Sequence, residues 1–252
     1  MFIHSIDPVL FSIGPLEIRY YGLVYVIGFL LLYFLLPKLA KQKGLKLSKE
    51  DASDLIIYLV IGVIAGARLF HVFVYNPSYY LSHPAEILAV WQGGLSFHGG
   101  FLGAVTAGWL FCRKKKFNLL DLADLTVIPL GIALGLGRIA NFINAELYGF
   151  RTGVPWAVKF PNAEGFRHPS QLYESAKNFF IFGVLWNVKN LKLPRGALFT
   201  LFTFMYGVLR FSVEFFRERE NLFLNISTGQ WLSLGMIIFS VVFYFMYVRK
   251  NR

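Results

Sequence analysis

The stretch GRIANFINAELYG, residues 137–149, places an arginine, two asparagines and a glutamate at the end of an apolar run. At 100° per residue, Arg138 and Asn141 share one helix face, and Asn144 lies about 60° further round. Glu146 falls on the opposite flank, so the four side chains can converge only if the helix ends or breaks near Asn144. A guanidinium fork in a partly dry cavity suits an oxyanion, above all a phosphate such as a lipid headgroup.

A second charged stretch, RFSVEFFR, places Arg210, Glu214 and Arg217 at helical spacing. Positions i, i+4 and i+7 form one stripe on a helix. Glu214 can neutralise one arginine of this stripe, which leaves net positive charge. The stretch therefore adds a second candidate contact for an anion.

His98 stands in the segment SFHGG, directly before two glycines. An imidazole changes charge near neutral pH and can act as a general base. The alternative is a hydrogen-bond donor that fixes helix packing beside Gly99 and Gly100.

The composition indicates that membrane-spanning helices position these residues. Hydrophobic residues make up 56% of the chain and charged residues only 15%. The apolar residues come in blocks of about 20, the length that a helix needs to cross a bilayer. We expect an all-α integral membrane protein of about seven spans in a single polytopic domain, residues 1–252. The predicted spans are 18–36, 55–75, 95–112, 120–143, 172–188, 197–216 and 229–248, with a small extracytoplasmic segment in the external loop 144–171.

The distribution of basic residues predicts the orientation of this bundle. The net charge is +11, but one set of alternate loops holds 15 Lys or Arg and the other set only 5. Basic loops stay in the cytoplasm, so we expect the N-terminus outside and the C-terminus in the cytoplasm. His98, Arg138, Arg210 and Glu214 then fall in the outer halves of their spans. The basic excess is a topology signal and requires no nucleic-acid partner. The N-terminus lacks the features of a cleaved signal peptide, so the first span is expected to remain.

Other polar residues favour structural roles. For Arg19, Lys177 and Arg217 we favour anchoring at the membrane interface, and for Arg68 a pairing with a carboxylate is as good a reading as substrate contact. Ser170, in the motif HPSQLYE, is predicted to cap the helix that begins near Gln171, with Glu174 close to its first turn. His168 is not expected to be catalytic.

Glycine pairs and the single cysteine complete the local signals. The pairs Gly62/Gly66, Gly99/Gly103 and Gly131/Gly135 would let helices approach closely. Cys112 is the only cysteine, and packing is its expected role. No metal cluster or nucleotide-binding loop is visible, so we expect no cofactor.

The motifs together resemble those of the bacterial prolipoprotein diacylglyceryl transferases. GRIANFINAELYG fills every fixed position of that family's signature. Further similarity lies in RYYGLVYVIGF, GGLSFHGGFLG, HPSQLYE and YGVLRFSVEFFR, in the family's order along nearly the whole chain. One difference is that the outer loop of this chain is short.

The resemblance implies a reaction in the bacterial inner membrane, with the active site toward the extracytoplasmic side. A member of this family transfers the diacylglyceryl group of phosphatidylglycerol to the lipobox cysteine of a prolipoprotein signal peptide. The products are a thioether and glycerol 1-phosphate. The family's essential residues correspond here to Tyr21, His98, Arg138, Asn141, Glu146, Gly149 and Arg210.

The chemistry of this reaction assigns roles to the same residues. Breaking a C–O bond to phosphate needs positive charge, for which Arg138 and Arg210 are the candidates. The substrate thiol needs a base; His98 is the first candidate, and for Glu146 we favour an orienting role.

The uncharged polar residues of the motifs are expected to bind the lipid headgroup, and for some of them a structural role is the alternative. Asn141 and Asn144 are expected to donate to headgroup oxygens, although Asn144 can equally be a helix cap. Tyr21 would bind the headgroup or serve as an interfacial tyrosine. With Gly149 and Glu214 they make up the expected substrate site.

Two other classes of protein compete with the enzyme. A transporter or channel for a lipid or small anion also lines its path with arginine and glutamate. A non-catalytic assembly factor is the second. Crowding of the polar residues in the outer half argues against transport, with Asp121 and Asp124 as the only candidates toward the cytoplasmic side.

Overall fold

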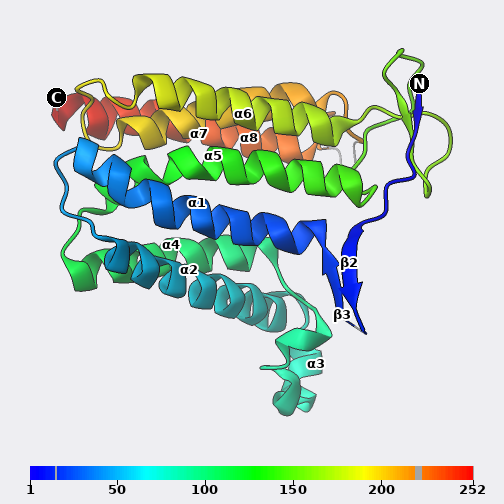
Figure 1. Ribbon diagram of the computed structural model, residues 1–252, viewed down its shortest axis with the longest axis horizontal. Coiled ribbons are helices and arrows are strands. Elements are labelled where there is room, and N and C mark those ends of the chain that lie inside the picture. The colour runs from blue at the N-terminus through cyan, green and yellow to red at the C-terminus, as the bar shows by residue number, and fades with distance from the viewer. Residues whose placement is uncertain (15, 219–222, 252) are drawn as a thin grey trace. The chain divides into compact units, whose positions relative to one another are not determined.

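The computed structural model describes residues 1–14, 16–218 and 223–251, and in them the chain is mostly helical. The long helices are α1 (Tyr20–Gln42), α2 (Lys49–Phe70), α4 (Phe97–Lys115), α5 (Leu119–Ile143), α6 (Ser170–Val188), α7 (Ala197–Glu214) and α8 (Thr228–Phe243). Two of them continue as π-helical turns, α2 into His71–Tyr75 and α8 into Tyr244–Val248. Each predicted span overlaps one of these helices (Figure 1).

The remaining elements are short. Helix α3 (Pro77–Ser82) and the 3₁₀ turns Pro84–Glu86 and Val90–Gln92 lie between α2 and α4. A last 3₁₀ turn covers Arg249–Asn251. Strands β2 (Val9–Ile13) and β3 (Leu16–Arg19) form an antiparallel pair, and β1 (Phe2–Ile3) pairs in parallel with β4 (Val158–Lys159).

Five helices of the described chain are long and apolar enough to cross a membrane. They are Tyr20–Gln42, Lys49–Tyr75, Leu119–Ile143, Ala197–Glu214 and Thr228–Val248. The other two predicted spans coincide with α4, which ends in basic residues, and with α6, which carries Glu174 and Lys177 near its start.

The chain divides into two compact units, residues Met1–Leu35 with Ala123–Arg252 and residues Leu36–Leu122. In the first unit, α7 packs against α6 and α8. Helix α5 approaches α6 closely because Gly135 has no side chain; a Cβ there would meet the ring of Phe179 at 2.8 Å. The hydroxyl of Ser175 on α6 also donates to the carbonyl of Gly135, at 2.9 Å. Near the start of the unit, Gly28 of α1 lies against Ala133 of α5.

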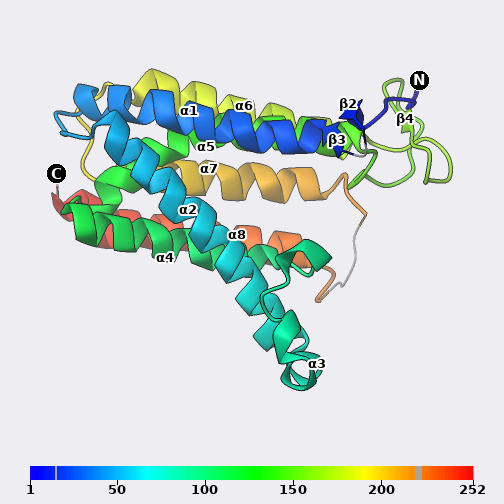
Figure 2. The same ribbon diagram turned by 60° about the horizontal axis from the view of Figure 1, so that its bottom comes forward.

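The N-terminal strand and the segment 144–169 lie at one end of this first unit, which we call the loop end. Strand β1 pairs with β4 in the register Phe2↔Val158, and Figure 2 shows β4 beside the N-terminus. The buried ring of His4 bonds the carbonyl of Phe142 through Nε2 at 2.8 Å. The loop end is therefore held together by backbone pairing between segments far apart in sequence.

In the second unit, α2 and α4 pack along a line of glycines. A Cβ on Gly62 would lie 2.6 Å from the carbonyl oxygen of Gly103, and one on Gly66 would collide with the carbonyl of Gly99. The backbones thus touch directly, as the glycine pairs predicted. Side chains cap the N-termini of both helices. Ser48 and Asp51 form a capping box on α2, and the Ser96 hydroxyl accepts a hydrogen bond from the amide of Gly99 on α4.

Candidate active site

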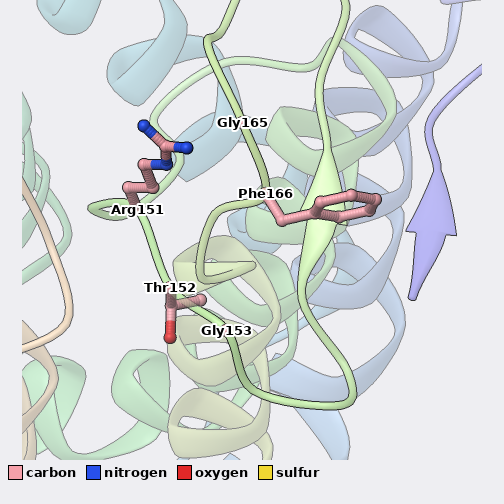
Figure 3. Close-up of a pocket in the computed structure, with 5 residues that line it drawn as sticks. All are labelled: Arg151, Thr152, Gly153, Gly165 and Phe166. Atoms are coloured by element: carbon pink, nitrogen blue, oxygen red, sulfur yellow. The ribbon is translucent and has the colours of Figure 1, made fainter.

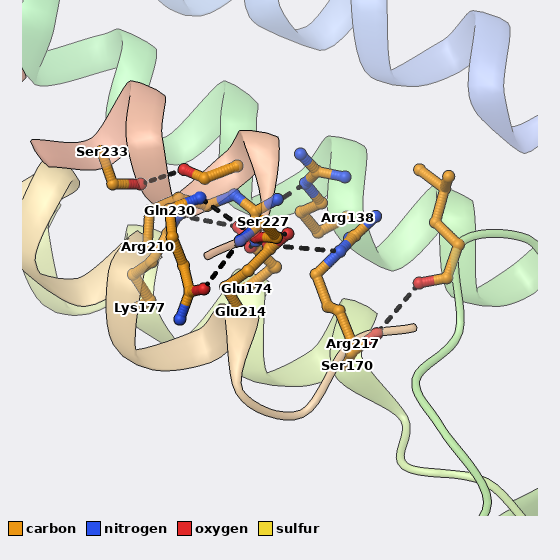
Figure 4. A network of polar contacts seen from close by, with 12 residues as sticks. Arg138, Ser170, Glu174, Lys177, Arg210, Glu214, Arg217, Ser227, Gln230 and Ser233 are labelled. Carbon is orange, nitrogen blue, oxygen red and sulfur yellow. Dashed lines mark hydrogen bonds and ion pairs between the residues drawn. The ribbon is translucent and has the colours of Figure 1, made fainter. Parts of the chain in front are cut away.

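Charged side chains from three helices of the first unit gather at the loop end (Figure 4). They come from the last turns of α5 and α7 and the first turns of α6, and the start of α8 closes the group. We call this set the charged cluster; its members are Arg138, Glu174, Lys177, Arg210, Glu214 and Arg217.

The chain after α5 turns so that Glu146 reaches back to the asparagines. The helix ends at Ile143, and Ala145 and Leu147 both have positive φ, at 55° and 59°. Glu146 Oε1 accepts from Asn144 Nδ2 at 2.9 Å and from Asn141 Nδ2 at 3.2 Å. The helix therefore ends where convergence of these side chains required it. Non-glycine residues in the left-handed region are strained, which is frequent at functional sites.

The start of α6 holds this turn in place. The hydroxyl of Ser170 donates to the carbonyl of Leu147 at 2.9 Å, and Gln171 Nε2 donates to the carbonyl of Glu146 at 2.6 Å. The prediction that Ser170 caps its own helix is wrong, because Pro169 occupies the cap position without a side-chain bond. The hydroxyl bonds the neighbouring turn instead, and both residues are fully buried.

Gly149 lies where two segments of the loop end cross. It pairs with Arg217 in an antiparallel bridge, and its amide donates to the carbonyl of His168 at 2.9 Å. A Cβ at this position would collide with the carbonyl oxygen of Phe216. Gly149 therefore lets the turn bearing Glu146 lie against the end of α7, and no other residue fits without a shift of the backbone.

Glu174 is the centre of the charged cluster, and the sequence-based reading did not single it out. Its side chain is 0% exposed. Oε1 lies 2.8 Å from Arg210 Nη1; Oε2 lies 2.7 Å from Lys177 Nζ and 3.9 Å from Arg138 Nε. The available signal was the cost of burying an ionised group, which made an acid at the start of a predicted span a candidate for pairing.

The expectation that Lys177 anchors at the interface is wrong. Its side chain is only 3% exposed, and its ammonium lies 3.8 Å from the centre of the Tyr206 ring of α7. Snorkelling requires an outward-facing position, whereas this face of α6 packs against α7.

Glu214 connects the end of α7 to the start of α8. It lies 2.5 Å from Arg210 Nη1 and 3.7 Å from Arg217 Nε, so the stripe predicted for these three residues exists. Its other oxygen accepts from the hydroxyl of Ser227 at 3.0 Å. Ser227 also forms a capping box with Gln230, which starts α8.

The two arginines that were predicted to hold a phosphate are engaged to different degrees. Arg210 contacts Glu174 and Glu214 at normal ion-pair distance. For Arg138, the nearest carboxylate oxygen of the described residues is 3.9 Å away, and its Nη1 donates to Asn141 Oδ1 at a long 3.5 Å. The cluster contains four cations and two carboxylates, a net charge of +2. It is thus suited to an anion, and of these two arginines Arg138 has the more available fork.

His98 belongs to the second unit and has its own set of contacts. It is exposed at the start of α4, and its Nδ1 lies 3.2 Å from the hydroxyl of Tyr75. Tyr75 ends the π-helical turn that follows α2 and also receives a long bond, 3.4 Å, from Ser96. Among the described residues no hydrogen bond engages Nε2 of His98, so this nitrogen is open to a substrate; it is the basic nitrogen in the tautomer in which Nδ1 donates to Tyr75.

Arg68 pairs with no carboxylate of the described residues. Its side chain donates to the backbone carbonyls of Ile87 at 2.9 Å, Gly93 at 2.6 Å and Glu86 at 2.6 Å, and its guanidinium lies over the ring of Tyr80. It therefore ties the segment between α2 and α4 to the end of α2. A sequence contains no signal for bonds to distant carbonyls.

The remaining predicted residues lie at the edges of the first unit. Tyr21, on the first turn of α1, is exposed and packs edge-on against Tyr25. His168 is buried against the rings of Phe150 and Phe216, and its Nδ1 lies 3.0 Å from the hydroxyl of Tyr173. Burial lowers the pKa of His168 below its ordinary value and favours the neutral ring.

Two hollows lie outside the charged cluster. One, of about 440 Å³, is formed by the segment 144–169 and lined by Arg151, Thr152, Gly153, Gly165 and Phe166. Figure 3 shows Arg151 and Phe166 pointing in different directions, so its side chains do not converge. The other, of about 570 Å³, follows the α2–α4 crossing and has an apolar lining. Among the described residues no three His, Cys, Asp or Glu side chains are placed to hold a metal ion.

Comparison with known proteins identifies the family. Residues 8–246 match the family model described as prolipoprotein diacylglyceryl transferase. A phosphatidylglycerol–prolipoprotein diacylglyceryl transferase of Geobacter sulfurreducens is 45% identical to this chain, over 98% of the chain and 97% of the relative. Proteins of the same name from Nitrosomonas europaea and Bordetella avium are 47% and 43% identical, over 94% and 97% of the chain and 88% and 96% of the relatives.

Proposed function

Because the chain belongs to the prolipoprotein diacylglyceryl transferase family and is a transferase, we propose that it lipidates the lipobox cysteine of prolipoproteins. The cysteine sulfur attacks the carbon of the diacylglyceryl group that is bonded to the phosphate oxygen of phosphatidylglycerol. The C–S bond of a thioether forms, the C–O bond breaks with its electron pair going to the phosphate, and glycerol 1-phosphate leaves. The thiol proton goes to a base.

The charged cluster is the observation that supports this reaction. The leaving phosphate gains negative charge as the C–O bond breaks, and a fixed site of net charge +2 stabilises that charge more than it stabilises the starting lipid. We assign Arg138 to the phosphate because its fork is less engaged with carboxylates than that of Arg210. Arg210, paired with two carboxylates, supports it. Asn141, Asn144 and Glu146 lie beside Arg138 and bind or orient the headgroup, and Gly149 allows their turn to form.

The nucleophile is supplied by the substrate. Cys112 is the only cysteine of the chain. It is buried near the end of α4, whereas His98 lies at the start of that helix. For the base we retain His98, since its Nε2 is open, with Tyr75 orienting the ring through Nδ1. Glu146 already accepts two amide bonds, which supports its orienting role. Tyr21 is proposed to contact the headgroup from the start of α1.

For topology we propose seven spans, with the charged cluster toward the extracytoplasmic side of the bacterial inner membrane. Pairing of β1 with β4 supports this arrangement, because it brings residues before α1 and residues after α5 to the same end of the unit. An even number of crossings must then separate them. Helices α1, α2, α4 and α5 provide four, so α4 counts as a span although it is less apolar than the others.

One residue that could have lined a transport path has a structural role instead. Asp124, one of two candidates for a polar path away from the loop end, accepts from the amides of Gly196 and Phe199 at 3.0 and 2.8 Å. It therefore caps the start of α7 and does not line a path.

A reconstituted assay tests the proposal. Purified protein in detergent, with phosphatidylglycerol and a lipobox peptide, is expected to yield a thioether-linked diacylglyceryl peptide and glycerol 1-phosphate in equal amounts. A peptide with serine in place of the lipobox cysteine is the matched control and should remain unmodified. Passage of lipid or anion across vesicles without modified peptide would favour the transporter.

A further inference from the structure

Lys177 is a buried cation that the proposed mechanism does not yet use. It lies on α6 one turn after Glu174, with its ammonium 2.7 Å from Glu174 Oε2 and its side chain 3% exposed. It also lies over the ring of Tyr206. A lysine at this depth is costly unless it is paired, so its partner defines what it does there.

The partner is shared with both arginines of the proposed phosphate site. Oε2 of Glu174 faces Lys177 at 2.7 Å and Arg138 at 3.9 Å, whereas Oε1 faces Arg210 at 2.8 Å. If Lys177 carried no charge, Arg138 and Arg210 would be the remaining ion-pair partners of Glu174 among the described residues. The buried carboxylate would then draw on the charge of the residue that is meant to face the lipid.

We propose that Lys177 is a positioning residue that neutralises Glu174, so that the guanidinium of Arg138 stays available for the phosphate of the substrate and product. This inference rests on the proposed function, since it concerns the same site. Lys177 touches neither substrate nor reacting atoms, and acts through Glu174.

The variants for the test are chosen by the net charge that each leaves on the charged cluster. The wild-type cluster has net charge +2, and Lys177→Met, whose unbranched side chain is one atom shorter than that of lysine, lowers it to +1. The pair Glu174→Gln with Lys177→Met restores +2 without a buried ion pair, and removing both partners of such a pair disturbs a fold less than removing one. Lys177→Gln removes the same charge but can still bond Glu174, which provides a second single variant.

The experiment measures anion affinity separately from turnover. In the single variants we expect the KM for phosphatidylglycerol and the inhibition constant of glycerol 1-phosphate to rise about 10-fold, the effect of one nearby charge in a partly dry site. The KM for the lipobox peptide should stay within about 2-fold. The double variant should recover both anion constants to within about 3-fold of wild type. Lys189→Met, which removes a half-buried cation just beyond the same helix, should change nothing.

Two results would overturn the inference. One is that both single variants keep the wild-type KM for phosphatidylglycerol and the wild-type inhibition constant of glycerol 1-phosphate. The other is an equal loss in every kinetic constant, with a lowered Tm and no recovery in the double variant, which would make Lys177 a packing residue. Calorimetric titration of glycerol 1-phosphate into the same proteins needs no turnover. Failure of wild type to modify the peptide would therefore refute the proposed function, while the titration would still decide the role of Lys177.

Discussion

At the residue scale, the feature that decides the chemistry is how much of each guanidinium is already engaged. Arg210 is bound between Glu174 and Glu214, whereas the nearest carboxylate oxygen to Arg138 among the described residues is 3.9 Å away. A bidentate fork needs two free N–H groups on one face, and a lysine cannot provide them. The two arginines should therefore respond differently to the same substitution.

Arg138→Lys keeps the charge but removes the fork. We expect kcat/KM for phosphatidylglycerol to fall about 100-fold or more, comparable to the loss of one donor to a developing oxyanion. Arg210→Lys should lose less, because Arg217 lies on the same stripe and Glu214 stays paired with it. The control Arg113→Lys, at the far end of α4, should keep wild-type rates. Full activity of Arg138→Lys in detergent would reduce Arg138 to a point charge.

His98→Gln tests the base. We expect a rate loss of about 10² to 10⁴ near pH 7, which shrinks as the pH rises past the pKa of the substrate thiol, because hydroxide then ionises the thiol without help. Binding of phosphatidylglycerol should be nearly normal. His83→Gln, in the exposed segment before α4, is the matched control. Wild type must be profiled over the same range, and an equal loss at every pH with a lowered Tm would make His98 structural.

At the scale of elements, two contacts between helices support the site in different ways. The start of α6 serves the charged cluster twice: Ser170 and Gln171 bond the turn after α5, and Glu174 gathers the cations. The start of α4, which carries His98, is positioned by close approach of backbones at Gly62, Gly66, Gly99 and Gly103. The far ends of these two helices are joined by ion pairs of Lys115 with Asp51 and Asp54, whereas the approach at the glycines depends on the absence of side chains.

Gly103→Ala should therefore separate α2 from α4. A Cβ at Gly103 would collide with the carbonyl of Gly62, whereas one at Gly108, on the same helix, meets nothing within 4 Å. We expect Gly103→Ala to cost about 1–3 kcal/mol of stability through overpacking and to lower both Tm and activity. Gly108→Ala should be neutral or slightly stabilising. Thermal unfolding in detergent of the two variants measures the difference, and equal Tm values would show that the crossing tolerates a methyl group.

At the scale of the whole molecule, the distribution of charge predicts the orientation of the chain in the bilayer. Fifteen basic residues lie in one set of loops and five in the other. On this asymmetry we propose that the segment 144–169 lies outside and the basic run at 113–116 inside. An enzyme that modifies exported proteins needs its site on the outer side.

Cysteine labelling tests this orientation. In a Cys112→Ala background, a cysteine at Asn162 is expected to react with a membrane-impermeant maleimide added to intact spheroplasts, and one at Asn118 only after lysis. Both positions are exposed, so accessibility in the folded protein is the same and the membrane alone makes the difference. Labelling at Asn118 from outside would invert the topology and place the charged cluster in the wrong leaflet.

The sequence by itself determined the features that depend on local spacing. The length of the apolar blocks predicted the helices, because a helix must cross about 30 Å of hydrocarbon. Helical periodicity predicted the stripe of Arg210, Glu214 and Arg217, and the mismatch of Glu146 with that periodicity predicted the end of α5. All of these depend on neighbours within about two turns.

Only the tertiary structure decided which polar groups become buried together. Glu174 and Lys177 lie on a face of α6 that packs against α5 and α7, and nothing within their own helix distinguishes that face from the lipid-facing one. The same holds for Ser170, which bonds Leu147 and not its own helix, and for Arg68, whose partners are carbonyls about 20 residues away. Burial of an ion is tolerated only with its partners in place, and those partners come from segments that meet only when the helices pack.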